Sequence, residues 1–173
     1  MRASAPLLCP TDEAGLNKYS NLKHKIMETR ININEIDPAA YKAMYALEGY
    51  IQKSGLDKKL YELIKIRASQ INGCAFCLDM HTRDARKLGE TEQRIYVLPA
   101  WRETNFFTEN EQAALALTEE VTNIQGHVST ATYNRAVEVL GANQTAQVIM
   151  AAVTINAWNR IAITTHLMPE LAK

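Results

Sequence analysis

The fold is decided by residues 72–81, NGCAFCLDMH. Gly73 suits the left-handed conformation in which helices commonly end, so one helix is expected to stop there and the next to begin. In that next helix Cys74, Cys77 and His81 stand at positions i, i+3 and i+7, which share one helical face. The stretch therefore predicts a helical hairpin that carries two thiols and an imidazole on one side of its second arm.

Helix start and stop signals surround this hairpin on both sides. Asp37 followed by Pro38 begins a helix that ends at Ser54-Gly55, and Asp57 begins the first arm of the hairpin. Further helices are expected over residues 91–98, over residues 108–121 after a capping box, from Ser129 or Thr130 to Gly141, and from about Gln144 towards His166. Residues 148–155 are apolar nearly all round and are expected to be the most buried stretch. No segment alternates with period two for long enough to form a strand, so the predicted class is all-α.

Length and composition fit one domain without a strongly charged partner. The 173 residues are enough for a single core, assigned to residues 27–173, with residues 1–26 as a flexible N-terminal extension. The 19 Lys and Arg residues balance 19 Asp and Glu residues, which argues against a nucleic acid or an anionic membrane as partner. No apolar run reaches the ~18 residues of a membrane span and no signal-peptide pattern is present, so a cytoplasmic location is expected. In a reducing compartment a CxxC pair favours redox or metal chemistry over a structural disulfide.

The position of the two thiols favours nucleophilic chemistry. Both are expected in the first turn of their helix, where the macrodipole and free N–H groups favour a thiolate and lower the thiol pKa below about 8.5. His81 lies one turn beyond Cys77 and can take the thiol proton. In an antiparallel hairpin closed at Gly73, Glu62 falls at the level of His81 and not of the cysteines. The predicted relay runs from Glu62 to His81 to Cys77, with Cys74 one turn nearer to the loop.

Four interpretations of these residues remain open on the pattern alone. The first is that the thiols and the imidazole are ordinary buried residues on a core-facing stripe. The second is a Zn²⁺ site, whose ligands would be Cys74, Cys77, His81 and Glu62. The third is a redox sensor or binding module that uses the same thiols without turnover. The fourth, which the spacing and the helix position favour, is a catalytic dithiol that requires neither a metal nor another cofactor.

A longer pattern around the motif carries a family resemblance. It consists of Glu62, eleven further residues, Cys74-x-x-Cys77, three residues and His81. Its flanks are RASQING at residues 67–73, DMHT at residues 79–82 and INAWNR at residues 155–160. With these flanks, the chain from about Met27 to Pro169 resembles the alkylhydroperoxidase D-like proteins, which belong to the wider carboxymuconolactone decarboxylase family. Because the resemblance starts near Met27, that residue is an alternative start of the protein.

The resemblance implies a single-domain helical bundle of the alkylhydroperoxidase D-like type that assembles into trimers or hexamers. It implies a peroxidase that reduces hydroperoxides, in which Cys77 is oxidised to a sulfenic acid and Cys74 resolves it as a disulfide. Glu62 and His81 would relay protons, and an external thiol or dithiol would reduce the disulfide. The chain departs from the best-characterised peroxidases of the family at Phe76, where they carry a histidine. The decarboxylase branch generally lacks the cysteine pair, and lactone decarboxylation is the alternative activity.

Overall fold

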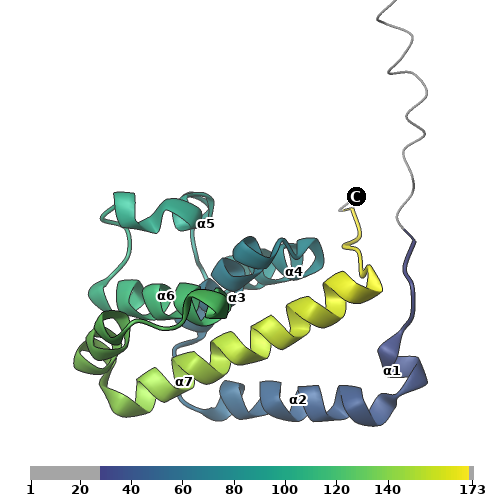
Figure 1. Ribbon diagram of the computed structural model, residues 1–173. Coiled ribbons are helices and arrows are strands. Elements are labelled where there is room, and N and C mark those ends of the chain that lie inside the picture. The colour runs from purple at the N-terminus through teal and green to yellow at the C-terminus, as the bar shows by residue number, and fades with distance from the viewer. Residues whose placement is uncertain (1–27, 172–173) are drawn as a thin grey trace, which may run out of the picture.

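The computed structural model describes residues 28–171, and all regular structure in this range is helical (Figure 1). The α-helices are α1 Ile33–Ile36, α2 Pro38–Lys53, α3 Lys58–Asn72, α4 Ala75–Lys87, α5 Glu92–Val97, α6 Glu109–Thr122 and α7 Thr130–Thr165. Two 3-10 segments, Leu98–Glu103 and Ile124–Gly126, lie between the later helices. The lack of strands within residues 28–171 confirms the all-α class, and none of the described helices is both long and apolar enough to cross a membrane. The extension predicted for residues 1–26 lies outside the described residues.

The hairpin forms where its sequence signals place it. The Asp57 side chain accepts a hydrogen bond from the Leu60 N–H group and caps α3, and Gly73 ends α3 in the left-handed conformation, with φ 70° and ψ 34°. A residue with a Cβ is strained at such a φ, so glycine is what permits the chain to reverse there. α4 then begins directly after Cys74. The two arms pack against each other, which brings side chains from the middle of α3 to the inner face of α4.

α3 is the most buried helix of the described chain. It is packed by α4, α6 and α7, and nine of its 15 residues are buried. The expectation that residues 148–155 form the most buried stretch is wrong, because Val153 is 43% exposed, whereas residues 60–66 of α3 are all buried. The reason is that one side of α7, which faces the viewer in Figure 1, is not covered by another of the described helices. α3, in contrast, is enclosed by its neighbours.

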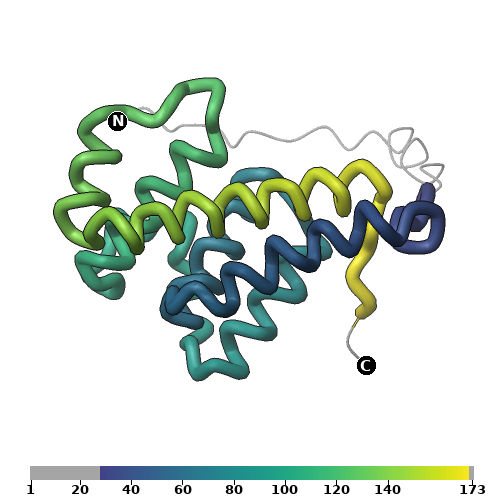
Figure 2. The backbone as a smooth tube through the Cα atoms, turned by 90° about the horizontal axis from the view of Figure 1, so that it is seen from below, coloured from purple at the N-terminus to yellow at the C-terminus, as the bar shows by residue number. Residues whose placement is uncertain are grey.

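α2 and α7 are far apart in the chain and lie side by side along the bundle (Figure 1, Figure 2). Gln147 Nε2 donates a hydrogen bond to the carbonyl oxygen of Ser54 at 2.6 Å, which ties the end of α2 to α7. α7 also contacts α3 and α4. The two helices therefore cover the hairpin, and the candidate site lies between them and its second arm.

Three helix boundaries differ from the sequence expectation. The short helix α1 precedes Asp37 and is capped by Asn32, although the sequence signals begin only at Asp37. The chain continues past Pro99 as a 3-10 segment, because proline at the second position of a helical turn has no N–H bond to lose. α7 spans both segments that are expected as separate helices, and its interruption lies at Gly141, with φ 76° and ψ 162°.

Candidate active site

The two thiols lie at the start of α4, against α7. Cys74 is the N-cap residue and Cys77 lies in the first turn. Their Sγ atoms are 2.7 Å apart, and both thiols are free. Cys74 is 1% exposed and Cys77 is 2% exposed, and Ile155 and Ala162 of α7 belong to the same apolar cluster. The two sulfurs are thus brought together in a buried, mostly apolar setting.

The contact between the two thiols shifts their pKa values in opposite directions. The hydrogen bond between the sulfurs is the largest effect and lowers the pKa of Cys74 to about 7, against the opposing effect of burial. The same hydrogen bond, followed by burial, raises the pKa of Cys77. The Asn159 side chain acts to lower the pKa of both thiols. The predicted fall in pKa therefore holds for Cys74 alone, and its main cause is the partner thiol rather than the helix terminus.

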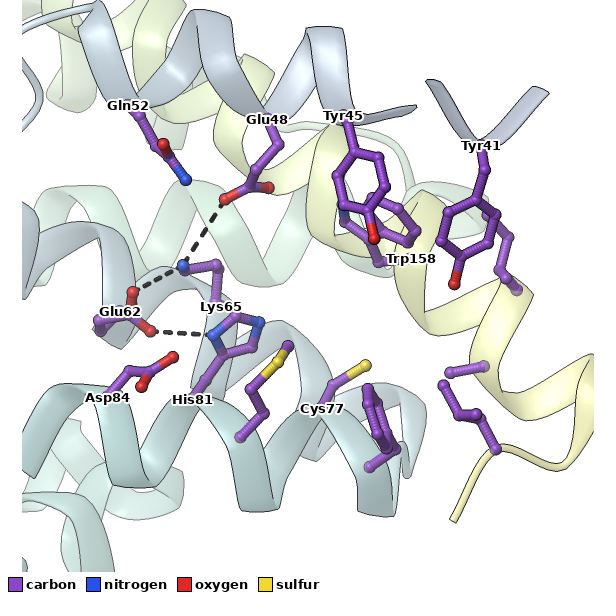
Figure 3. A pocket seen from close by; sticks show the side chains of 15 residues that line it. Tyr41, Tyr45, Glu48, Gln52, Glu62, Lys65, Cys77, His81, Asp84 and Trp158 are labelled. Carbon is purple, nitrogen blue, oxygen red and sulfur yellow. Dashed lines mark hydrogen bonds and ion pairs between the residues drawn. The ribbon is translucent and has the colours of Figure 1, made fainter. Parts of the chain in front are cut away.

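Glu62 and His81 make the contact that the hairpin geometry predicts. Glu62 Oε2 lies 2.9 Å from His81 Nδ1 (Figure 3). The other carboxylate oxygen, Oε1, lies 2.6 Å from Lys65 Nζ, and Glu48 Oε1 of α2 lies 3.9 Å from the same ammonium group. Glu62, Lys65 and His81 are all buried. Because a buried carboxylate requires a compensating charge, the Lys65 contact stabilises Glu62 where it orients His81.

A cavity of about 400 Å³ joins this relay to one of the thiols. Cys77 lines the cavity, whereas Cys74 is not among its lining residues. Glu62, Lys65 and His81 lie at one end of it, and Figure 3 shows the His81 ring and the Cys77 sulfur reaching the same space from α4. Of the two thiols, Cys77 is therefore the one that a molecule in the cavity can meet.

The wall of the cavity that α2 and α7 provide is aromatic. Tyr41 and Tyr45 of α2 and Trp158 of α7 form a cluster with ring centroids 5.2 to 5.6 Å apart. Phe76 also lines the cavity, from the same helix as Cys77. Aromatic walls of this kind hold apolar groups by removing their surface from water. The cavity thus has a charged end and an aromatic end, with Cys77 between them (Figure 3).

Two buried residues of the site, Lys65 and Asn159, have no role in the prediction from sequence. Lys65 stands three residues after Glu62, a spacing that puts both side chains on one face of α3. Asn159 Nδ2 donates to Ser69 Oγ at 3.0 Å, and its Oδ1 accepts from Asn72 Nδ2 at 2.8 Å. In the sequence, Lys65 could have been found as a cation three residues after Glu62. Asn159 could have been found as an amide within an apolar helix.

Ligand atoms suited to a metal gather at the relay and not at the thiols. Among the described residues, Glu62, His81 and Asp84 have ligand atoms within 4.8 Å of one another. Neither thiol belongs to this group, so the zinc site that combines both cysteines with Glu62 and His81 is not assembled. The Lys65 ammonium already pairs with Glu62 Oε1 and would repel a cation bound there. The arrangement favours proton transfer over metal binding.

Two sequence comparisons identify relatives of the chain. The sequence profile of the carboxymuconolactone decarboxylase family matches residues 38–120. The chain is 47% identical to the uncharacterized protein YdfG of Bacillus subtilis over 138 residues, which are 79% of this chain and 94% of that protein.

Solved structures show the same fold. A protein of unknown function from Agrobacterium tumefaciens, described as a candidate antioxidant defence protein AhpD, superposes with a TM-score of 0.81 at 38% identity, over 84% of this chain and 100% of that one. An uncharacterized peroxidase-related protein from a Silicibacter species superposes with a TM-score of 0.70 at 19% identity, over 95% of this chain and 89% of that one. The chain belongs to the carboxymuconolactone decarboxylase family and has an AhpD-like fold.

Proposed function

We propose that the chain is a thiol-dependent peroxidase that reduces alkyl hydroperoxides through a dithiol–disulfide cycle and so contributes to antioxidant defence. One observation carries the proposal: Cys77 lines a cavity that also contains the His81–Glu62 pair, and the Cys74 sulfur lies 2.7 Å from that of Cys77. A nucleophile, a proton-handling pair and a second thiol are the parts that such a cycle requires. Family membership and the description of the Agrobacterium neighbour as a candidate antioxidant protein support the same activity.

The cycle begins when the Cys77 proton moves across the sulfur–sulfur contact or to His81. The thiolate attacks the terminal oxygen of the hydroperoxide, and an S–O bond forms as the O–O bond breaks. Cys77 becomes a sulfenic acid, and the departing alkoxide takes up a proton and leaves as an alcohol. Cys74 then attacks that sulfur, water departs and a disulfide forms. An external dithiol reduces the disulfide and is itself oxidised. Glu62 orients His81 during these steps, and Lys65 stabilises Glu62.

Other interpretations of the site predict different chemistry. Lactone decarboxylation does not use a dithiol and leaves the 2.7 Å contact between the sulfurs unexplained. A redox sensor would oxidise the same thiols once without consuming hydroperoxide catalytically. The external thiol partner and the homo-oligomer, a trimer or a hexamer, remain predictions that belong to the peroxidase proposal.

Consumption of tert-butyl hydroperoxide in the presence of a dithiol reductant tests the proposal. Cys77→Ser should abolish consumption, and Cys74→Ser should leave a sulfenic acid on Cys77 that dimedone traps. Cys9→Ser, which keeps both site thiols, is the matched control and should retain the full rate. No consumption by the wild-type protein would rule out the peroxidase, and dimedone trapped on Cys74 in the wild-type protein would reverse the roles of the thiols.

A further inference from the structure

We propose that the hydroxyl group of Tyr41 protonates the oxygen atom that leaves when Cys77 attacks a hydroperoxide. The inference rests on the proposed peroxidase function and adds a catalytic residue from α2, a helix that contributes nothing to the CxxC motif or to the relay predicted with it. It assigns a chemical role to the aromatic wall of the cavity.

The chemistry of the attack requires a proton donor on the far side of the cavity from the sulfur. As the S–O bond forms, the O–O bond breaks in line with it, so the departing oxygen moves away from Cys77. An alkoxide is a strong base and a poor leaving group, and a donor within hydrogen-bond reach lowers the barrier by protonating it as it departs. That donor must face Cys77 from the wall that α2 and α7 provide.

The groups beside Cys77 on α4 do not meet this requirement. His81 lies one turn along the same helix, so it stands next to the sulfur rather than opposite to it, and its Nδ1 is engaged by Glu62 at 2.9 Å. Phe76 lines the cavity but has no proton to donate. His81 is therefore placed to take the proton of the attacking thiol, and the leaving oxygen needs another donor.

Tyr41 has the position and the freedom that this role requires. It lines the cavity together with Cys77, and Figure 3 shows its hydroxyl group pointing from α2 towards the side of the cavity that α4 forms. Edge contacts with Trp158 at 5.2 Å and with Tyr45 at 5.5 Å hold the ring. Figure 3 marks no interaction of the Tyr41 hydroxyl with the other cavity-lining residues drawn, so none of these residues occupies it.

Tyr41 also stays protonated at neutral pH. Burial first, and then the nearby Tyr45 and Cys77, raise its pKa above the ordinary value of 10.0. Tyr45, by contrast, is 58% exposed. Tyr41 is thus the better shielded of the two phenols that face the cavity.

The step balances in atoms and charge. The Cys77 thiolate takes the terminal O–H group of the hydroperoxide and becomes a sulfenic acid. The remaining alkoxide oxygen takes the phenolic proton of Tyr41 and leaves as an alcohol. The Tyr41 phenolate then recovers a proton from water. Cys77 is thus oxidised by two electrons, and Cys74 then attacks its sulfur to form the disulfide.

Single-turnover oxidation of the reduced protein tests the inference with Tyr41→Phe, which keeps the ring and removes only the hydroxyl group. The substrates are hydroperoxides whose leaving alcohols differ in acidity, including tert-butyl hydroperoxide and cumene hydroperoxide. Tyr41→Phe should slow oxidation by about 10²-fold, the usual contribution of a general acid. The rate should also depend more steeply on the acidity of the leaving alcohol. Alkylation of the same thiols by iodoacetamide has no oxygen leaving group, and its rate should keep its wild-type pH profile.

Tyr50→Phe is the matched control, because Tyr50 lies on α2, is 52% exposed and is not among the cavity-lining residues. It should oxidise at the wild-type rate. An unchanged oxidation rate in Tyr41→Phe would overturn the inference and leave the proposed peroxidase activity intact. An equal loss in the rates of oxidation and alkylation would also overturn it, because such a loss indicates a structural role for the hydroxyl group. A loss found in Tyr45→Phe instead would transfer the role to Tyr45. If none of the hydroperoxides oxidised the wild-type protein, the proposed function itself would be overturned, and the inference with it.

Discussion

The contact between Cys74 and Cys77 favours one negative charge on the pair near neutral pH. Their sulfurs are 2.7 Å apart, and two thiols at such a distance lose their protons in two steps that belong to the pair. The first step is favoured, because the hydrogen bond from the partner thiol lowers the pKa of Cys74 to about 7. The pair therefore gains a negative charge as the pH rises through about 7 and loses it below that value. In the proposed cycle, attack from Cys77 then requires only that the remaining proton cross the short contact or move to His81.

Replacing Cys77 by alanine should raise the pKa of Cys74. The variant lacks the hydrogen bond that is the largest cause of the lowered pKa, whereas burial, which opposes ionisation, is retained. The measurement is the ultraviolet absorbance of the thiolate as a function of pH, in a Cys9→Ala background so that only the site thiols contribute. With the pair intact, the first midpoint should lie at about pH 7. A midpoint in Cys77→Ala at or below that of the intact pair would contradict the assignment of the lowered pKa of Cys74 to its partner thiol.

The turn between α3 and α4 depends on one glycine, and Gly73→Ala should destabilise the protein by about 1 kcal/mol. A Cβ at this position meets no atom within 4 Å, so the cost comes from the backbone, which holds φ at 70°. Gly49→Ala, within α2, is the matched control: its Cβ also meets nothing within 4 Å, and alanine is favoured over glycine in a helix by up to about 1 kcal/mol. Urea unfolding should show the two substitutions acting in opposite directions. A Gly73→Ala variant that is as stable as the wild-type protein would mean that the turn relaxes without strain.

The hairpin and the relay could be predicted from the sequence because they depend on near neighbours. Asp57 caps α3 through a residue three positions away, and Gly73 fixes where the chain reverses. Once the reversal is placed, the register of two helices sets Glu62 against His81. None of this requires knowledge of distant parts of the chain.

The part of the aromatic wall that Tyr41 and Tyr45 form could not be predicted in the same way, because it depends on how α2 packs against α7. In the sequence, Tyr41 is simply one residue on the apolar face of its helix. Only the fold brings it to the cavity that Cys77 lines. The exposure of Val153 has a similar origin, since an apolar side chain gives no sign of which helices will cover it. The opposite pKa shifts of the two thiols follow from the 2.7 Å distance between their sulfurs, which the sequence spacing alone leaves open.

At the scale of the whole molecule, one carboxylate connects three separate segments. Glu119 of α6 accepts hydrogen bonds from Arg67 Nε of α3 at 2.6 Å and from Trp101 Nε1 at 2.9 Å, and Arg102 pairs with its second oxygen. Trp101 and Arg102 belong to the 3-10 segment Leu98–Glu103 that follows α5. Burial acts to raise the pKa of Glu119, but the hydrogen bonds from Arg102, Arg67 and Trp101 together outweigh it and lower the pKa.

Glu119 should therefore stabilise the folded protein more at neutral pH than at acidic pH. A carboxyl group whose pKa is lower in the folded state stabilises the protein fully above its unfolded pKa of about 4.3, and the contribution is lost as the pH falls through the folded pKa. Glu119→Gln removes the charge that Arg67 and Arg102 contact, so it should cost about 1–3 kcal/mol near pH 7 and much less near pH 3, by urea unfolding at both pH values. Glu138→Gln is the control, because the Glu138 side chain is 70% exposed in its pair with Arg135, and exposed pairs contribute little. An equal loss in Glu119→Gln at both pH values would show that shape, and not charge, joins α6 to α3 and to the segment after α5.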